Sequence, residues 1–243
     1  MSAPSQIPFL VNNEEPTELI KMFWYHTPIE EINQYLKENK NQVNVQTKNS
    51  FLTPLLYIID ISRYDSYSKL FNRHYQLSVI KLLLEYGADI NIYNVFFGTS
   101  YILCCYLDDV ETFQLLLEYG LDPELLVQKV RMTNCPHISY NYYPLCPLPT
   151  STPRGSFIHE MNIPLIEYAI EINACGIVKL LLDRGIKVNS YGSKHNSILL
   201  RDVSFYGYIY TTFVSYKMMI LLIKYYLIRL INLIKQEKAY FVL

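Results

Sequence analysis

The apolar residues of this chain recur with the spacing of short amphipathic helices, and one such helix pattern occurs three times. The three segments are residues 79–87 (VIKLLLEYG), 112–120 (TFQLLLEYG) and 177–185 (IVKLLLDRG). In each segment, a leucine triplet and an apolar residue upstream form a stripe at positions i, i+3 and i+4. A glycine follows each stripe, where a left-handed backbone can close a helix without strain. The pattern therefore predicts three helices that end at these glycines.

The spacing of the glycines indicates a repeated unit. Gly87 and Gly120 are 33 residues apart, and Gly185 follows after 65 residues, close to two such periods. A second helix is predicted before each patterned one, at residues 53–61, 99–107 and 164–172, and the first of these is expected to have Thr53 as N-cap and Pro54 at its first helical position. One unit of two helices cannot bury its own apolar face, whereas stacked units can. The pattern therefore predicts a stack of helix pairs.

The N-terminal part continues this pattern with two further helices. Thr27, Pro28 and Glu30 have the spacing of a capping box, which predicts a helix with Thr27 as N-cap and Pro28 as its first residue. The segment before it, EEPTELIKMFWYH, reads as another helix, so we expect residues 1–24 to form an N-terminal capping helix segment. About a dozen extra residues lie between the helix at 53–61 and the one that ends at Gly87.

The repeated unit resembles the ankyrin repeat. The matching residues are Thr53, Pro54 and Leu55 for the family's TPL motif, the helix 80–84, and Gly87, Ala88 and Asp89 at the hairpin entry, with weaker matches at Gly120, Asp122 and Gly185. The chain departs from the family at Leu56, where the family has His, and in lacking most of the inter-helix glycines. The resemblance covers about residues 25–190 and implies an all-α solenoid of about four to five divergent repeats.

The departures resemble those of poxvirus ankyrin proteins. Those proteins share long loops inside repeats, degenerate TPL motifs and a composition rich in Tyr, Ile and Asn; this chain has 23 Tyr. The resemblance implies a non-catalytic module that binds a host protein in the host cytoplasm and modulates the host response or host range. Many of those proteins also recruit cullin ubiquitin ligases through a C-terminal F-box-like element. The tail here has no such element, so the adaptor function stays an alternative.

Residues 128–160 interrupt the repeat. Their five prolines between Pro136 and Pro153 exclude a helix, so we expect a long loop insertion. In one interpretation the insertion is a recognition finger that carries Tyr140, Tyr142 and Tyr143. In the other it is a decayed repeat.

The tail, residues 191–243, is basic and apolar. Seven Lys or Arg against two acidic residues give it a net charge of +5, whereas the whole chain carries −1. We expect a helix at about 213–238. A membrane span needs about 20 apolar residues, and Lys224 and Arg229 interrupt this stretch, so no span is expected. Three interpretations of the tail remain. It is a helix docked on the last repeat, a helix lying at a membrane surface, or a segment that no longer follows the repeat.

No pattern of catalytic chemistry is visible. The chain lacks a phosphate-binding glycine loop and a nucleophile elbow, so we expect neither an enzyme nor a cofactor. Cys135, His137, Cys146 and His159 do not have zinc-site spacing, so no metal is expected. The adjacent cysteines at 104–105 are expected to fill the core. Five cysteines without a secretory N-terminus indicate a reducing, cytoplasmic compartment. The net charge of −1 gives no basis for nucleic-acid binding.

We therefore expect binding at the hairpin tips of a monomeric protein. The tip after Gly87 places four residues where exposure is expected: Tyr93, Asn94, Phe96 and Phe97. Tyr191 holds the corresponding place in the last hairpin. Exposed aromatic residues are typical anchors of protein interfaces. Peripheral membrane association through the C-terminal helix is the remaining alternative.

Overall fold

The computed structural model describes residues 15–61, 72–94, 97–132, 158–186, 218, 220–225 and 227, and this part of the chain is mostly helical. The elements are α1 (Glu18–Trp24), α2 (Ile29–Glu38), η2 (Lys40–Asn44), α3 (Pro54–Asp60), α5 (Arg73–Glu85), α6 (Ser100–Leu107), α7 (Val110–Glu118), β1 (Leu126–Met132), β2 (Ile158–Pro164), α8 (Leu165–Glu171) and α9 (Cys175–Asp183). The predicted helix pairs at 53–61 with 79–87, 99–107 with 112–120, and 164–172 with 177–185 are confirmed as α3/α5, α6/α7 and α8/α9.

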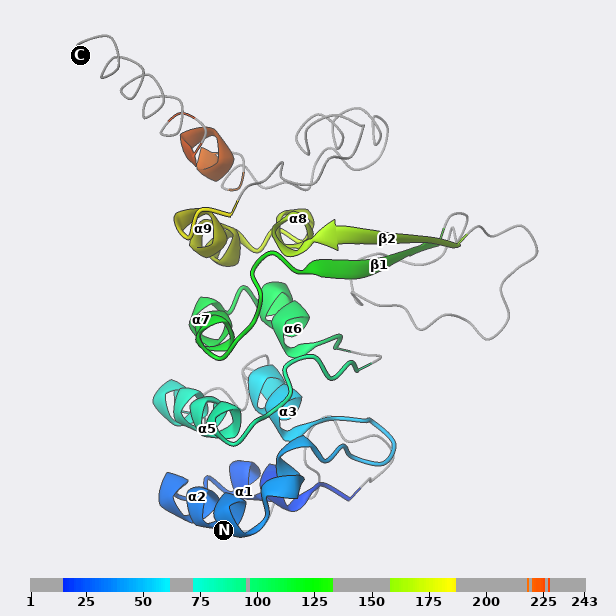
Figure 1. Ribbon diagram of the computed structural model, residues 1–243. Coiled ribbons are helices and arrows are strands. Elements are labelled where there is room, and N and C mark those ends of the chain that lie inside the picture. Colours follow the sequence, from blue (N-terminus) through cyan, green and yellow to red (C-terminus); the bar gives the residue numbers. More distant parts are fainter. Residues whose placement is uncertain are drawn as a thin grey trace. The chain divides into compact units, whose positions relative to one another are not determined.

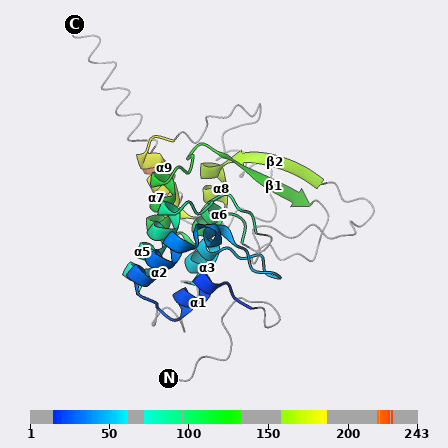
Figure 2. The ribbon, with the colours of Figure 1, turned by 60° about the horizontal axis from the view of Figure 1, so that its bottom comes forward.

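The chain divides into two compact units. The first comprises Met1–Leu121 and Val130–His159, and the second Asp122–Lys129 and Glu160–Leu243. In the first unit the helices lie in two rows, α1, α3 and α6 in one and α2, α5 and α7 in the other (Figures 1 and 2). Helix α3 packs against its own partner α5 and against α6 of the next pair, and α5 packs against α7. In the second unit α8 packs against α9.

One residue with a left-handed backbone lies in the turn between the two helices of three pairs, α1/α2, α6/α7 and α8/α9. His26, Asp108 and Asn173 have φ values of 52°, 51° and 65°, and each donates its N–H to the carbonyl three residues before it. In all three turns the next residue donates to the carbonyl five residues before it, as Asp109 does to Cys104 over 3.0 Å. Asn, Asp and His adopt this conformation more readily than other non-glycine residues. They therefore fill the position at which the sequence lacks an inter-helix glycine.

The predicted glycine ends of the second helices are confirmed. Gly87, Gly120 and Gly185 have φ values of 82°, 99° and 85°. The residue after each glycine donates its N–H back into the last helical turn, as Ala88 does to the carbonyl of Leu83 over 2.9 Å. This is the Schellman type of helix end, which satisfies the free carbonyls of the last turn.

One predicted cap is confirmed and another is wrong. Thr53 accepts a hydrogen bond from the N–H of Leu56 over 3.1 Å, with Pro54 at the first helical position. The capping box at Thr27 does not form, because Pro28, with ψ of 144°, takes the N-cap position of α2 and no side chain caps this helix. The carbonyl of Thr27 instead accepts a hydrogen bond of 2.9 Å from the Tyr75 hydroxyl.

The two-stranded sheet of β1 and β2 was not predicted. The strands lie side by side and run in opposite directions (Figure 1), and they include both ends of the segment 128–160 that was expected to be loop. All five prolines of that segment lie between the strands, at 133–157, outside the described residues. These prolines exclude a helix, but residues 128–132 and 158–160 contain none, so the two ends of the segment can pair.

Most of the patterned apolar residues lie in the core, whereas Leu115 and Leu180 are only partly buried. Cys104 and Cys105 are 0% and 1% exposed, which confirms that they fill the core. In the tail, the described residues from 218 to 227 are helical, and Met218 and Leu222 are buried whereas Ile223 and Leu227 are half exposed. Within the described residues, no helix has the length and apolar character needed to cross a membrane.

Candidate protein-interaction surface

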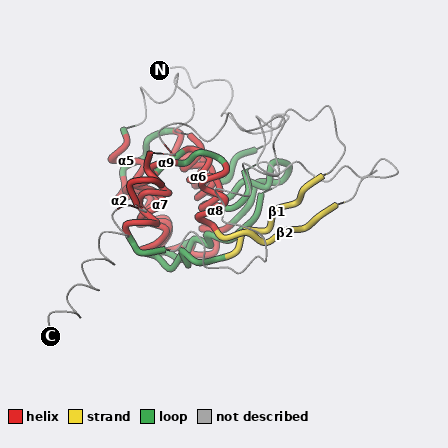
Figure 3. The backbone as a smooth tube through the Cα atoms, turned by 90° about the horizontal axis from the view of Figure 1, so that it is seen from above, coloured by secondary structure: helices red, strands yellow, loops and turns green. Residues whose placement is uncertain are grey.

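Two loops of the first unit leave the helices on the same side (Figures 1 and 3). We call residues 45–53, which connect η2 to α3, the first loop, and residues 87–99, which connect α5 to α6, the second loop. Residues 95–96 of the second loop lie outside the described residues.

The side chain of Asn44 connects the base of the second loop to the end of η2. Its Nδ2 donates to the carbonyl of Gly87 over 3.1 Å, and its Oδ1 accepts from the N–H of Asp89 over 2.8 Å. One amide thus satisfies both a backbone acceptor and a backbone donor, as a neighbouring β-strand would. The base of the second loop is thereby fixed to the preceding helix pair.

The side chain of Asn94 connects the two loops further out. Its Nδ2 donates to the carbonyls of Ser50 and Phe51 over 2.8 and 2.9 Å, and its Oδ1 accepts from the N–H of Phe97 over 3.2 Å. The side chain is fully buried at 0% exposure. The expectation that Asn94 is an exposed contact is therefore wrong, because its amide is used to hold the two loops together.

The first loop is also closed by its own side chains. The N–H of Thr47 donates to the carbonyl of Leu52, and the N–H of Leu52 donates to the hydroxyl of Thr47, both over 3.0 Å. The hydroxyls of Thr47 and Ser50 are 2.6 Å apart, and both residues are buried. Gln46 Nε2 donates to the Phe51 carbonyl over 3.2 Å. These contacts leave the backbone of this loop little freedom.

Two aromatic rings project from these loops. Phe51 is 51% exposed and Tyr93 49% exposed, whereas Phe97 is partly buried. Partial burial raises the pKa of the Tyr93 phenol above its ordinary value, so the ring is uncharged at neutral pH. Sequence reasoning placed Tyr93 at an exposed tip but missed Phe51, whose signal is a lone aromatic residue between the turn residues KNS and the N-cap Thr53.

The other candidate contact residues lie outside the described part of the chain. These are Phe96 in the second loop, Tyr140, Tyr142 and Tyr143 in the insertion, and Tyr191 after the last predicted helix. The candidate surface is therefore formed by the first and second loops.

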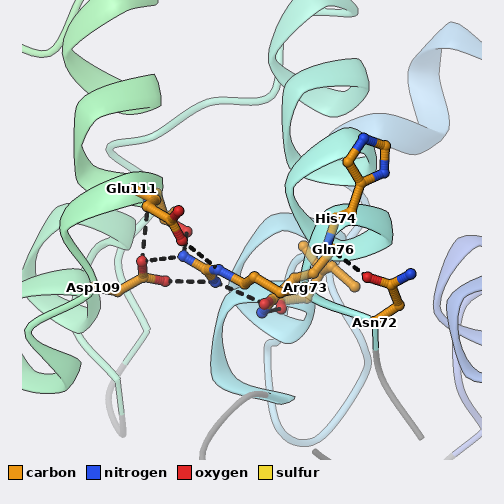
Figure 4. A network of polar contacts seen from close by, with 8 residues as sticks. Asn72, Arg73, His74, Gln76, Asp109 and Glu111 are labelled. Atoms are coloured by element: carbon orange, nitrogen blue, oxygen red, sulfur yellow. Dashed lines mark hydrogen bonds and ion pairs between the residues drawn. The ribbon is translucent and has the colours of Figure 1, made fainter.

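An arginine at the start of α5 fastens α5 to α7 (Figure 4). Arg73 Nε donates to Glu111 over 2.9 Å, Nη1 donates to Gln76 and Asp109 over 2.7 and 3.1 Å, and Nη2 donates to Asp109 and to Thr112. Burial disfavours the guanidinium charge, but Asp109 and Glu111 outweigh it and raise the pKa of Arg73 above its ordinary value. All five donors of the guanidinium are in use. Arg73 therefore holds two helix pairs together and has no donor left for a ligand.

The tyrosines of the repeated LLLEYG segment connect neighbouring helix pairs in the same way. Tyr86 donates its hydroxyl to the Asn33 side chain in α2 over 2.6 Å, and Tyr119 donates its hydroxyl to Glu85 in α5 over 3.3 Å. Each tyrosine follows the last residue of its own helix and contacts the preceding helix of the same row. The 33-residue repetition of the tyrosine thus corresponds to a repeated contact.

No protein-family model matches the chain, and no curated protein matches its sequence. The charge of the first unit adds one constraint. Over residues 1–121 and 130–159, the sequence has fourteen Asp or Glu and ten Lys or Arg. This acidic excess disfavours nucleic acid and anionic lipid as ligands, because both would be repelled.

Proposed function

We propose that the chain is a non-catalytic protein-binding module built from stacked ankyrin-type helix pairs. The proposal is supported by the two rows of helices in the first unit, by the recurring left-handed turns, and by the tyrosine contacts at a spacing of 33 residues. The sequence resemblance to poxvirus ankyrin proteins supports a host protein as the partner. Binding would act by competition with, or sequestration of, that protein in the cytoplasm.

One observation carries the assignment of the binding surface. Asn94 is buried and holds the two loops together, yet the ring of Tyr93 beside it is half exposed. A rigid backbone that presents an exposed aromatic ring loses little conformational entropy on binding. The loops therefore have the properties of a prearranged protein contact.

Affinity purification from host cells tests this function. The full chain is compared with Tyr93→Ser and with Tyr25→Ser, a control at another exposed aromatic residue, which is 60% exposed. A specific partner is expected with the wild type and the control and should be lost or strongly reduced with Tyr93→Ser. Retention of no protein, or equal retention by all three forms, would contradict the proposal. Cullin subunits among the retained proteins would instead support the ligase-adaptor alternative.

A further inference from the structure

Phe51 has a backbone conformation that does not suit its side chain. Its φ is 51°, in the left-handed region, and the other non-glycine residues with positive φ in the described part are His26, Asp108 and Asn173. Those three types tolerate this region, whereas a bulky aromatic residue there is an outlier. Glycine or asparagine would fit the backbone of this position better.

The loop imposes this conformation on Phe51. Its carbonyl accepts one hydrogen bond from Gln46 and one from Asn94, at 3.2 and 2.9 Å. The N–H and carbonyl of the next residue, Leu52, are both bonded to Thr47. The backbone of Phe51 is thus held by hydrogen bonds on both sides of the residue.

The ring contributes little to the stability of the fold. It is 51% exposed, so only about half of its apolar surface is removed from water. The gain from this partial burial is similar in size to the cost of a left-handed conformation for a residue with a side chain. Phe51 therefore offers no clear advantage for folding over asparagine. Backbone strain held in place by surrounding contacts is a known feature of binding sites.

We propose that Phe51 is the principal contact residue of the loop surface and that its partner is a folded protein with an apolar pocket that accepts an aromatic ring. The inference rests on the proposed function. A ring that projects from a tight loop needs a concave surface on the partner. The acidic excess of the first unit further favours a pocket bordered by basic residues.

The first experiment tests whether the ring is dispensable for folding. Denaturant unfolding of the full chain is compared for wild type, Phe51→Asn and Phe113→Ala, a fully buried phenylalanine in α7. The unfolding equilibrium constant of Phe51→Asn should lie within about fivefold of wild type, whereas Phe113→Ala should raise it more than a hundredfold. A loss for Phe51→Asn as large as that for Phe113→Ala would overturn the proposal, because the ring would then be structural.

The second experiment tests the contact itself. The protein retained by the wild type is purified, and its Kd is measured for wild type, Phe51→Asn and the control Tyr25→Asn. Phe51→Asn should weaken binding at least tenfold, and Tyr25→Asn should not change it. Because an apolar contact is not screened by salt, most of the effect of Phe51→Asn should persist in 1 M NaCl.

The outcomes separate the two proposals. Equal affinity of wild type and Phe51→Asn would overturn the inference about Phe51 and leave the proposed function standing. A wild type that retains no protein would overturn the proposed function and this inference with it. Sedimentation equilibrium of the isolated chain tests whether a second copy binds this surface instead. A wild-type dimer that Phe51→Asn abolishes would overturn the inference that the partner is a different protein.

Discussion

Replacement of Arg73 by methionine should destabilise the first unit strongly, because Arg73 connects α5 to α7. The variant leaves the carboxylate of Asp109, whose side chain is only 8% exposed, without its cationic partner. Removal of one member of a buried ion pair costs about 3–5 kcal/mol. The Arg73 side chain is 36% exposed, so solvent screens part of the interaction and the lower end applies, about 3 kcal/mol. The contact to Glu111, which is 66% exposed, adds at most about 0.5 kcal/mol.

The assay is chemical denaturation at pH 7, read with hydrogen exchange of the amides in α5 and α7. Lys179→Met in α9 is the matched control, since the ion pair of Lys179 with Asp183 joins side chains that are 64% and 60% exposed. The control should cost less than about 0.5 kcal/mol. The double variant Arg73→Met/Asp109→Asn should recover at least about 1 kcal/mol relative to the sum of the single changes. A loss in the free energy of unfolding below about 0.5 kcal/mol for Arg73→Met would refute the reasoning, as would strict additivity of the two changes. Either result would mean that Arg73 and Asp109 form an ordinary surface ion pair.

Four further predictions each concern one residue or one pair of neighbouring residues. Tyr86→Phe should cost about 1 kcal/mol in the free energy of unfolding, since it removes the hydroxyl donor to α2, and no loss would contradict the contact. Gly120→Ala should cost about 1 kcal/mol through backbone strain alone, because φ is 99° and nothing lies within 4 Å of the added Cβ. Burial lowers the pKa of His26 from 6.5, so the neutral form is favoured on folding and stability should fall as pH drops below that value; His26→Asn should lose this pH dependence. Burial raises the pKa of the Cys104 and Cys105 thiols, so mass spectrometry should find both unalkylated in the native protein and alkylated after unfolding.

The helix pairs could be predicted because their signals are local. The leucine triplets, the closing glycines and the cap at Thr53 each depend on residues a few positions apart. Thr27 shows the limit of such signals, since the same pattern was interpreted as a capping box but Pro28 took the N-cap position. The pairing of β1 with β2 joins segments separated by 133–157, and nothing in either strand alone indicates its partner.

The candidate surface was predictable only in part. The position of Tyr93 after a hairpin entry indicated exposure, and its ring is half exposed. The role of Asn94 depends on the backbone of Ser50 and Phe51, more than forty residues earlier, so no local pattern reveals it. Phe51 was missed because a left-handed backbone at a phenylalanine is imposed by tertiary hydrogen bonds and contradicts its own preference.

The most direct test of the central claim, that the loop surface binds a host protein, is site-specific photo-crosslinking in host cells. A photoreactive phenylalanine analogue is placed at Tyr93 in one form of the full chain and at Tyr25 in another. Both side chains are exposed, so both forms can react with any neighbour. A discrete adduct of defined mass is expected from position 93 and should be absent from position 25. No adduct from position 93, or the same adducts from both positions, would contradict it.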